Sequence, residues 1–520
     1  INTLGLGAGR WHDFEFYGND TWKFSSRVTL NLGMRWSRYS PAYAQDNHIS
    51  NFIPSLYNGK DPLSGLVRAD QAGSLGRSLV KPYNKGYQPR VGLAWDIFGD
   101  GKTALRMGIG RFMGRANVIE DILRMNGNPP WTTTVASNWG GSSTNLADDP
   151  TFRSLDTINP GLKNAVAGVG ANTPFNAVST DFRPPDSYQW NLTISREVMK
   201  DTVLEVSYIG NEGHHLWRRG VQFNDVLPQN RLKVAQDFLA KDTNLTAFVN
   251  QNRRFPNLGP ITMSESTGNS NYNALQIWLN RRFTKRLSYS VSYSWSHALS
   301  DVPLTSFTSA TTDPYNYHLD YGDADLDRRH IFVANAVYGL PTFGRAGSFV
   351  DQVLGGWQLN SIVTFYSGIP LDVFSGVNAN YNGLAAAPAN GGLRPNIVPG
   401  QSIYLNTGDS TAYLNPAAFA LPAPGTFGNL TRGLVRQPSI HNVDFSLAKN
   451  WSMHERYRLQ FRAEFFNLFN HTNFNGFGNS VFVFSQPSPG VITTTPNGSF
   501  GKLNSDLGPR NIQFGVKLNF

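Results

Sequence analysis

Apolar and polar residues alternate one by one along many segments of this chain. In residues 27–39, one side of an extended backbone would carry Val28, Leu30, Leu32, Met34 and Trp36. In residues 286–298, serines would occupy one side, and the other side would carry Tyr289, Val291, Tyr293 and Trp295. Because successive side chains of a β-strand point to opposite faces, this period of two residues predicts strands with one apolar and one polar face.

Thirteen segments of this kind can be placed along the chain. They lie near residues 12–22, 27–39, 89–98, 102–113, 187–197, 202–217, 271–284, 286–298, 328–340, 356–368, 441–450, 457–468 and 510–520. Short and long connections alternate between them, and the long ones lie near 40–88, 114–186, 218–270, 299–327, 369–440 and 469–509. A compact soluble domain seldom carries so many long loops without regular structure. Short turns on the periplasmic side and long extracellular loops are typical of an outer-membrane barrel.

The pattern therefore predicts an all-β fold, a transmembrane antiparallel β-barrel of the outer-membrane type. If residues 469–509 are extracellular, the last strand runs toward the periplasm, and so does the first. Bacterial single-chain barrels almost always have an even number of strands. We therefore expect residues 1–520 to be the C-terminal portion of a larger barrel, with at least one strand before Ile1. A strand hidden in a long loop is the alternative explanation.

Composition is compatible with such a barrel and argues against other classes. Charged residues make up 16% of the chain, aromatic residues 13%, and glycine contributes 50 residues, which favours strands and turns. No apolar run approaches the roughly 18 residues of a membrane-spanning helix, whereas a spanning strand needs only about 10 alternating residues. The chain has no cysteine. Its net charge of +9 is scattered without a basic run, so we expect no nucleic-acid partner.

The last strand is apolar on one face up to the final residue. That face would carry Ile512, Phe514, Val516, Leu518 and Phe520. Chain ends of globular domains are usually frayed and polar. Since lipid offers no hydrogen bonds, every strand edge in a membrane must be paired, and we interpret this strand as the seam of a barrel.

Several segments resemble the C-terminal barrel of TonB-dependent outer-membrane receptors, in the Oar-like branch. They include "DLDRRHIFVANAVYGLPTFG", "GGWQLNSIVTFYSGIPLDV", "RLQFRAEFFNLFNHTNF" and the final "RNIQFGVKLNF". The resemblance implies a barrel of about 22 strands in the bacterial outer membrane, with an N-terminal plug domain inside it. It also implies active import driven through the TonB complex, which grips an N-terminal box, and a terminal strand that the barrel-assembly machinery reads as an insertion signal.

Neither a plug domain nor a TonB box is found in these 520 residues. The expected partners are outer-membrane lipid, the barrel-assembly machinery, the TonB complex through a region absent here, and an extracellular ligand of unknown identity, such as a glycan or a peptide. The alternative is a structural or adhesive surface protein that uses the barrel as an anchor. No cofactor and no enzymatic activity are expected, because no serine lies in a G-x-S-x-G context and the histidines are dispersed.

Aromatic side chains in the long loops are the candidate ligand-binding residues, because their flat faces could stack on sugars or peptides. They are Tyr43, Trp131, Trp139, Tyr315, Tyr317 and Tyr381. An equally good interpretation is that these rings pack the loops against one another.

A weak candidate for a metal site lies in "DYGDADLDRRH". It places carboxylates at Asp320, Asp323, Asp325 and Asp327, and calcium prefers clustered oxygen ligands. The glycine and the distal glutamate of an EF-hand loop are absent. Local pairing with neighbouring arginines is therefore the favoured interpretation, and no metal is expected.

Overall fold

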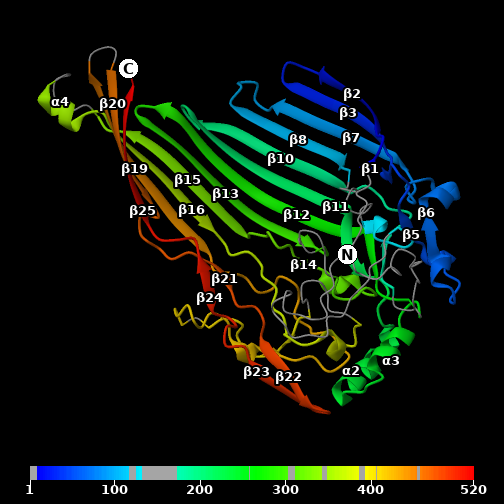
Figure 1. Ribbon diagram of the computed structural model, residues 1–520. Coiled ribbons are helices and arrows are strands. Elements are labelled where there is room, and N and C mark those ends of the chain that lie inside the picture. The colour runs from blue at the N-terminus through cyan, green and yellow to red at the C-terminus, as the bar shows by residue number, and fades with distance from the viewer. Residues whose placement is uncertain are drawn as a thin grey trace, which may run out of the picture.

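The computed structural model describes residues 9–115, 124–131, 173–256, 258–302, 311–341, 348–385, 393–405, 407–453 and 457–519. Its main feature is one antiparallel sheet whose strands follow chain order (Figure 1). They are β2 (Phe14–Lys23), β3 (Val28–Tyr39), β7 (Tyr83–Asp96), β8 (Thr103–Met113), β10 (Asp186–Met199), β11 (Thr202–Gln222), β12 (Ile261–Thr284), β13 (Leu287–Ser300), β15 (His330–Gly339), β16 (Trp357–Tyr366), β19 (Ile440–Met453), β20 (Tyr457–Phe466) and β25 (Asn511–Asn519). The thirteen strands expected from the alternation are confirmed.

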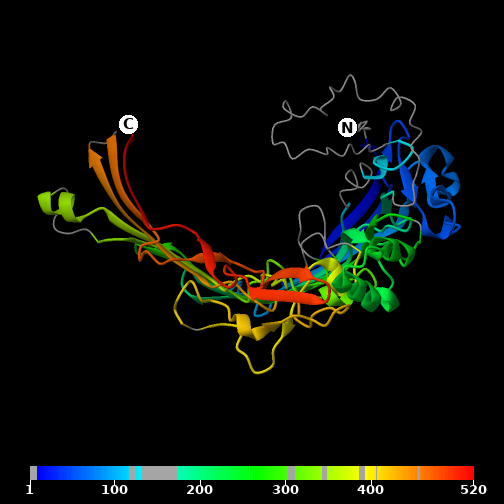
Figure 2. The same ribbon diagram turned by 60° about the horizontal axis from the view of Figure 1, so that its bottom comes forward.

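The sheet curves into an open trough, as Figure 2 shows. Strands β2 and β25 form its two edges, and within the described ranges no backbone pairing joins them. The expectation that the last strand forms a seam therefore stays a prediction. No helix in the described part of the chain is long and apolar enough to cross a membrane.

Strand pairing gathers most of the large apolar residues on one side of the sheet. Leu32 pairs with Val91, and Met107 pairs with Leu192 further along. At the far edge Ala463 pairs with Phe514. Large apolar side chains on this apolar face are exposed, among them Phe16, Leu32, Val91, Ile109, Leu192, Ile194, Tyr208, Trp295, Ile512, Phe514, Val516 and Leu518. Such an extended apolar surface on a folded chain indicates contact with lipid or protein rather than water.

Tight turns join the strands at one end of the sheet, which we call the turn end. Asp201 lies in the turn after β10, and Lys285 and Arg286 form the turn after β12; all three have positive φ. The two-residue turn Lys285–Arg286, with positive φ at both positions, matches the twist of the paired strands. In the turn after β7, Asp96 accepts hydrogen bonds from the backbone amides of Gly99 and Gly101.

The long connections meet at the opposite end, and they are more regular than expected. They contain the short strands β4 (Tyr43–Ala44), β5 (Ser50–Phe52), β6 (Leu66–Arg68), β9 (Phe175–Val178), β14 (Gly322–Asp323), β17 (Asn396–Ile397), β18 (Phe419–Ala420), β21 (Phe474–Phe477), β22 (Phe482–Ser488), β23 (Val491–Pro496) and β24 (Leu503–Asp506). Helices α2 (Arg231–Ala240) and α3 (Leu245–Gln251) lie there as well. Strand β1 (Gly9–Arg10), which precedes β2, pairs with β4. We call this assembly of long connections the loop cap.

The loop cap has its own apolar cores. One gathers Ile49, Leu79, Met125 and Val178 from connections far apart in sequence. Another surrounds Val373, Leu414, Phe419, Leu430, Phe477 and Phe500. The expectation that the long loops lack regular structure is therefore wrong, because together they bury enough apolar surface to fold on one another.

Three strands also extend further into the loop cap than the sequence suggested. Strand β7 begins at Tyr83, β11 continues to Gln222, and β12 begins at Ile261. Register shifts interrupt the pairing of β11 with β12 beyond Gly213. Since each shift breaks the alternation of faces, the period of two could not reveal these extensions.

Candidate functional site

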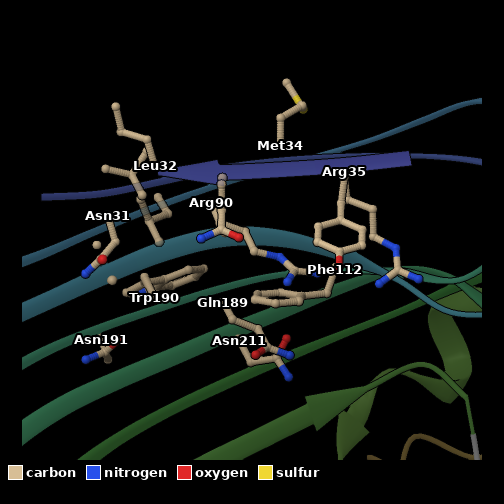
Figure 3. Close-up of a pocket in the computed structure, with 18 of the residues that line it drawn as sticks. Asn31, Leu32, Met34, Arg35, Arg90, Phe112, Gln189, Trp190, Asn191 and Asn211 are labelled. Atoms are coloured by element: carbon tan, nitrogen blue, oxygen red, sulfur yellow. The ribbon is translucent and has the colours of Figure 1, made fainter. Parts of the chain in front are cut away.

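A hollow of about 800 Å³ lies on strands β2 to β12. Two rows of paired residues cross it on the side opposite to the apolar face. The first row contains Asn19, Gly33, Arg90, Gly110, Gln189, Asn211 and Tyr272. The second row contains Asn31, Gly92, Gly108 and Asn191. We call this region the wall hollow. Figure 3 shows Leu32 and Met34 on one side of β3, and Asn31 and Arg35 on the other.

Glycines create the depth of the wall hollow. A Cβ atom at Gly33 or Gly92 would meet no heavy atom closer than 3.6 Å, which is ordinary van der Waals contact, so a side chain could be added there without a clash. At Gly108 a Cβ atom would lie 2.6 Å from the side-chain oxygen of Asn191. These glycines are half-buried or buried, and the larger side chains of Arg90, Phe112 and Asn191 stand beside them, so the polar face is uneven in height there.

The side chains around these glycines are amides, aromatic rings and two arginines. Arg90 lies over the ring of Phe112, with 4.6 Å between the guanidinium carbon and the ring centroid. Arg35 forms an ion pair with Glu15. Amide groups both donate and accept hydrogen bonds, and aromatic faces stack on apolar sides of sugars or peptides. The wall hollow therefore presents hydrogen-bonding groups beside aromatic faces.

Sequence reasoning did not find the wall hollow. Each of Gly33, Gly92, Gly108 and Gly110 occupies a polar-face position of an alternating segment, which was visible in the sequence. Their proximity depends on the register between neighbouring strands, and the sequence alone does not indicate this register.

Three of the six candidate loop aromatics use their hydroxyls within the loop cap. Tyr315 donates to the carbonyl of Asp225 over 2.9 Å, and Tyr381 donates to the carbonyl of Pro422 over 3.0 Å. Tyr317 donates to a carboxylate oxygen of Glu265 over 2.8 Å. Each contact joins two segments that are far apart in the sequence. Such contacts agree with the interpretation that these rings pack the loops against one another.

Tyr43 and Trp131 lie in another part of the cap. The guanidinium of Arg77 lies 4.6 Å from the ring centroid of Tyr43. Trp131 stacks on His48 with 4.4 Å between ring centroids. Trp139 lies outside the described residues, as does Phe520 of the terminal strand. The five described candidates therefore do not form one site.

Carboxylates between β13 and β15 bind arginines from other parts of the cap and sheet. Asp301 pairs with Arg218, Asp313 with Arg231, Asp320 with Arg394, and Asp325 with Arg432, while Asp323 and Asp327 share Arg436. The distances that join these pairs include 2.6 Å for Asp313 with Arg231 and 3.1 Å for Asp301 with Arg218. The connection between β13 and β15 is thus the electrostatic centre of the loop cap.

All four carboxylates of the weak calcium candidate belong to this network. Asp323 also binds Arg329 over 2.9 Å and the ring of His297 over 2.9 Å. Asp320 accepts from the Thr312 hydroxyl over 2.5 Å. Within the described ranges, no group of three or more potential ligands is arranged to hold a metal ion. Arginine side chains are the charged partners of these carboxylates in the structure.

A buried carboxyl makes the loop cap sensitive to pH. Asp225 is almost fully buried and accepts hydrogen bonds from the amides of Val226 and Ala385. Burial raises the pKa of Asp225 to about 6, and these hydrogen bonds and the charges of Arg253 and Arg231 limit the rise. The folded cap then binds this proton more tightly than the unfolded loop does. Its stability is therefore greatest below the unfolded pKa and falls as pH rises through about 6.

We expect hydrogen exchange in residues 223–260 to become faster between pH 5 and pH 7, after correction for the intrinsic rates. The change in protection over this pH range should be about 1.4 kcal/mol, which corresponds to one pKa unit. Asp225→Asn keeps an acceptor oxygen and removes the titrating group, so most of this pH dependence should disappear. An unchanged pH dependence in the variant would assign it to another group.

Comparison with known proteins shows which family the chain belongs to. The model of the family described as outer membrane beta barrel domain matches residues 2–513. TonB-dependent transporter Oar from Myxococcus xanthus is 23% identical over 514 residues, which cover 95% of this chain and 39% of that protein. The chain therefore spans well under half of this curated relative.

Two solved structures are also similar to this chain. The outer membrane transporter YddB from Escherichia coli has a TM-score of 0.46 and 10% identity, and the match covers 98% of this chain and 54% of that chain. The siderophore receptor PiuA from Acinetobacter baumannii has a TM-score of 0.43 and 9% identity, with 98% and 43% covered. An outer-membrane barrel accounts for the alternating strands, the exposed apolar face and the polar wall of the sheet. The chain belongs to the family of outer membrane β-barrel domains, of the kind found in TonB-dependent transporters such as Oar, and it lies in the bacterial outer membrane.

Proposed function

We propose that this barrel serves TonB-dependent uptake of an extracellular ligand that is polar and of low net charge, such as a glycan or a peptide. The observation that carries the proposal is the wall hollow, where amides and aromatic rings lie beside several glycines of the sheet. Sugars and peptides both present hydrogen-bonding groups beside apolar faces, and both need a mixture of amide and aromatic partners. The ligand passes along this wall without chemical change.

The loop cap would capture the ligand before it reaches the wall. Loops that are already ordered lose little conformational entropy on binding, which favours affinity. The ion pairs of Asp313 and Asp325 fix loops relative to one another. We propose that Tyr315, Tyr317 and Tyr381 maintain this arrangement, and that Tyr43, Trp131 and Trp139 offer aromatic surface to the ligand.

The energy for import would come from the TonB complex, which acts through an N-terminal region of the receptor. We further propose that the barrel-assembly machinery recognises the apolar face of the terminal strand, formed by Ile512, Phe514, Val516, Leu518 and Phe520. The exposure of the first four of these side chains leaves that face available for such recognition during insertion into outer-membrane lipid.

Filling the wall hollow tests the proposal. Gly92→Leu adds a side chain where a Cβ atom meets nothing closer than 3.6 Å, so it should occupy the hollow without displacing the backbone. Uptake of labelled neutral oligosaccharides and tryptic peptides would be measured in cells that carry the full-length receptor. For the probes that the unmodified receptor imports, we expect roughly a tenfold loss, because about 1.4 kcal/mol of binding free energy corresponds to a factor of ten.

Gly515→Leu is the matched control. Gly515 pairs with Arg462 on the polar side of β25, and its Cβ would meet no atom within 4 Å. This variant should import normally. Equal uptake by both variants would contradict a role for the wall hollow, and uptake that survives dissipation of the proton gradient would contradict TonB dependence.

A structural or adhesive function is the second candidate, and the ion-paired cap favours it. A cap held by buried charge pairs offers a fixed surface for contact with other molecules or cells. In that case, deletion of the receptor would reduce cell adhesion while the uptake of every probe stayed unchanged.

A further inference from the structure

Helix α4 (Phe349–Leu354) exposes a row of apolar side chains at the turn end of the sheet. Phe349 is 80% exposed, and Val350, Val353 and Leu354 are each close to half exposed. Positions 349, 350, 353 and 354 fall on one side of a helix, while Asp351 and Gln352 fall on the other. Figure 1 shows α4 beside the ends of β15 and β16, away from the loop cap.

Three side chains of the sheet donate hydrogen bonds to backbone carbonyls of α4 and of Gly355, which follows it. The indole nitrogen of Trp357 donates to the carbonyl of Val353 over 2.9 Å, and that of Trp451 donates to the carbonyl of Gln352 over 3.1 Å. The ammonium group of Lys449 donates to the carbonyls of Val353 and Gly355. A lysine at the last carbonyls of a helix also complements the helix dipole.

The register places these three residues on the lipid side. Lys449 pairs with Trp357 on one flank and with Phe461 on the other, and Phe461 pairs with Val516 of the apolar face. Lys449 is nevertheless almost fully buried, because α4 and the two indoles cover it. The helix therefore lies over the apolar face itself and not over the polar wall.

Other exposed aromatic residues lie at the same end of the sheet. Trp22 lies at the end of β2 and Phe24 in the turn after it, Phe98 lies in the turn after β7, and Phe283 is next to the turn after β12. Aromatic girdles at this level mark the membrane interface of outer-membrane barrels. The apolar side of α4 thus continues a surface that the sheet already presents to lipid.

We propose that α4 is an interfacial helix that inserts Phe349, Val350, Val353 and Leu354 into the phospholipid of the periplasmic leaflet. Short amphipathic segments of this kind bury their apolar side at the boundary between headgroups and acyl chains. Ser348 caps the amide of Asp351 at the start of the helix, and Lys449 holds its end, so the helix is formed before it meets the lipid. The proposal requires a barrel in the membrane, and does not depend on what the barrel transports.

Single-cysteine labelling tests this placement. The 520 residues contain no cysteine, so Phe349→Cys, Val353→Cys and Gln352→Cys each introduce one thiol into this part of the receptor. The full-length receptor would carry an environment-sensitive dye at that thiol, in vesicles of phosphatidylethanolamine and phosphatidylglycerol. The lipids would be brominated either near the headgroup or near the chain ends. Resistance of the folded barrel to heat on gels would verify that each variant is folded.

We expect bromine near the headgroup to quench the dyes at 349 and 353 at least about twofold more strongly than the dye at 352. Bromine at the chain ends should quench all three weakly. Equal quenching at the three positions by an aqueous quencher, without quenching by lipid, would overturn the proposal. A second outcome would also overturn it: lipid does not quench the dyes at 349 and 353, but periplasmic extract shields them from the aqueous quencher. The apolar side of α4 would then bind a protein and not lipid.

Discussion

Arg231→Ala is expected to destabilise the loop cap by about 3–5 kcal/mol. Two nitrogens of this guanidinium bind both oxygens of Asp313, at 3.0 and 2.6 Å, and both side chains are nearly buried. Removal of the arginine leaves a buried carboxylate without its cation, and such a charge is costly in an apolar surrounding. The contact joins the start of α2 to the connection between β13 and β15, so the effect should reach both loops.

Hydrogen exchange of the amides in α2 and α3 measures this loss of stability. Arg68→Ala provides the control, since the ion pair of Arg68 with Asp70 is exposed and should contribute little. In the double variant Arg231→Ala with Asp313→Ala, stability should partly recover, because neither charge is left alone. Protection in α2 that stays unchanged in the single variant would show that the pair does not hold the cap together.

A charge on the apolar face is expected to destabilise the barrel itself. Leu192 lies in the middle of β10, exposed on the apolar face between Met107 and Tyr208. Leu192→Arg should lower the free energy of unfolding in lipid by about 2–4 kcal/mol, the cost of an arginine near the middle of the bilayer. Reversible unfolding in urea from lipid vesicles, followed by tryptophan fluorescence, measures this change.

The neighbouring residue supplies a matched control. Asn191 lies on the same strand but faces the polar wall, so Asn191→Arg should change the free energy of unfolding by less than about 1 kcal/mol. Equal costs for the two variants would contradict the assignment of the two faces.

The strands could be predicted from the sequence because lipid and water impose opposite demands on their two faces. Leu30, Leu32 and Met34 on β3 must be apolar, whereas Asn31 between them need not be, so the alternation persists along the strand. Where β11 and β12 rise into the loop cap, both faces pack against protein. Buried Ile261 and Met263 then lie beside buried Ser264, and the alternation that marks a strand is lost.

The sites were harder to predict because they depend on contacts between distant residues. Arg231 and Asp313 are 82 positions apart, and nothing in either local sequence indicates the other. The wall hollow depends on the register that pairs Gly33 with Arg90 and Arg90 with Gly110. Aromatic loop residues were recognisable as candidates. Their use as packing residues, as for Tyr317 with Glu265, became visible only with the folded loops.

Spin labels along β10 test the central claim, that the sheet has one face in lipid and one facing a polar interior. A nitroxide would be attached at each position from Tyr188 to Ser195 in the full-length receptor in lipid vesicles. We predict that oxygen, which concentrates in lipid, relaxes the labels at 188, 190, 192 and 194, and that a water-soluble nickel chelate relaxes those at 189, 191, 193 and 195. A smooth profile without a period of two residues, or one with the two sets exchanged, would contradict the barrel described here.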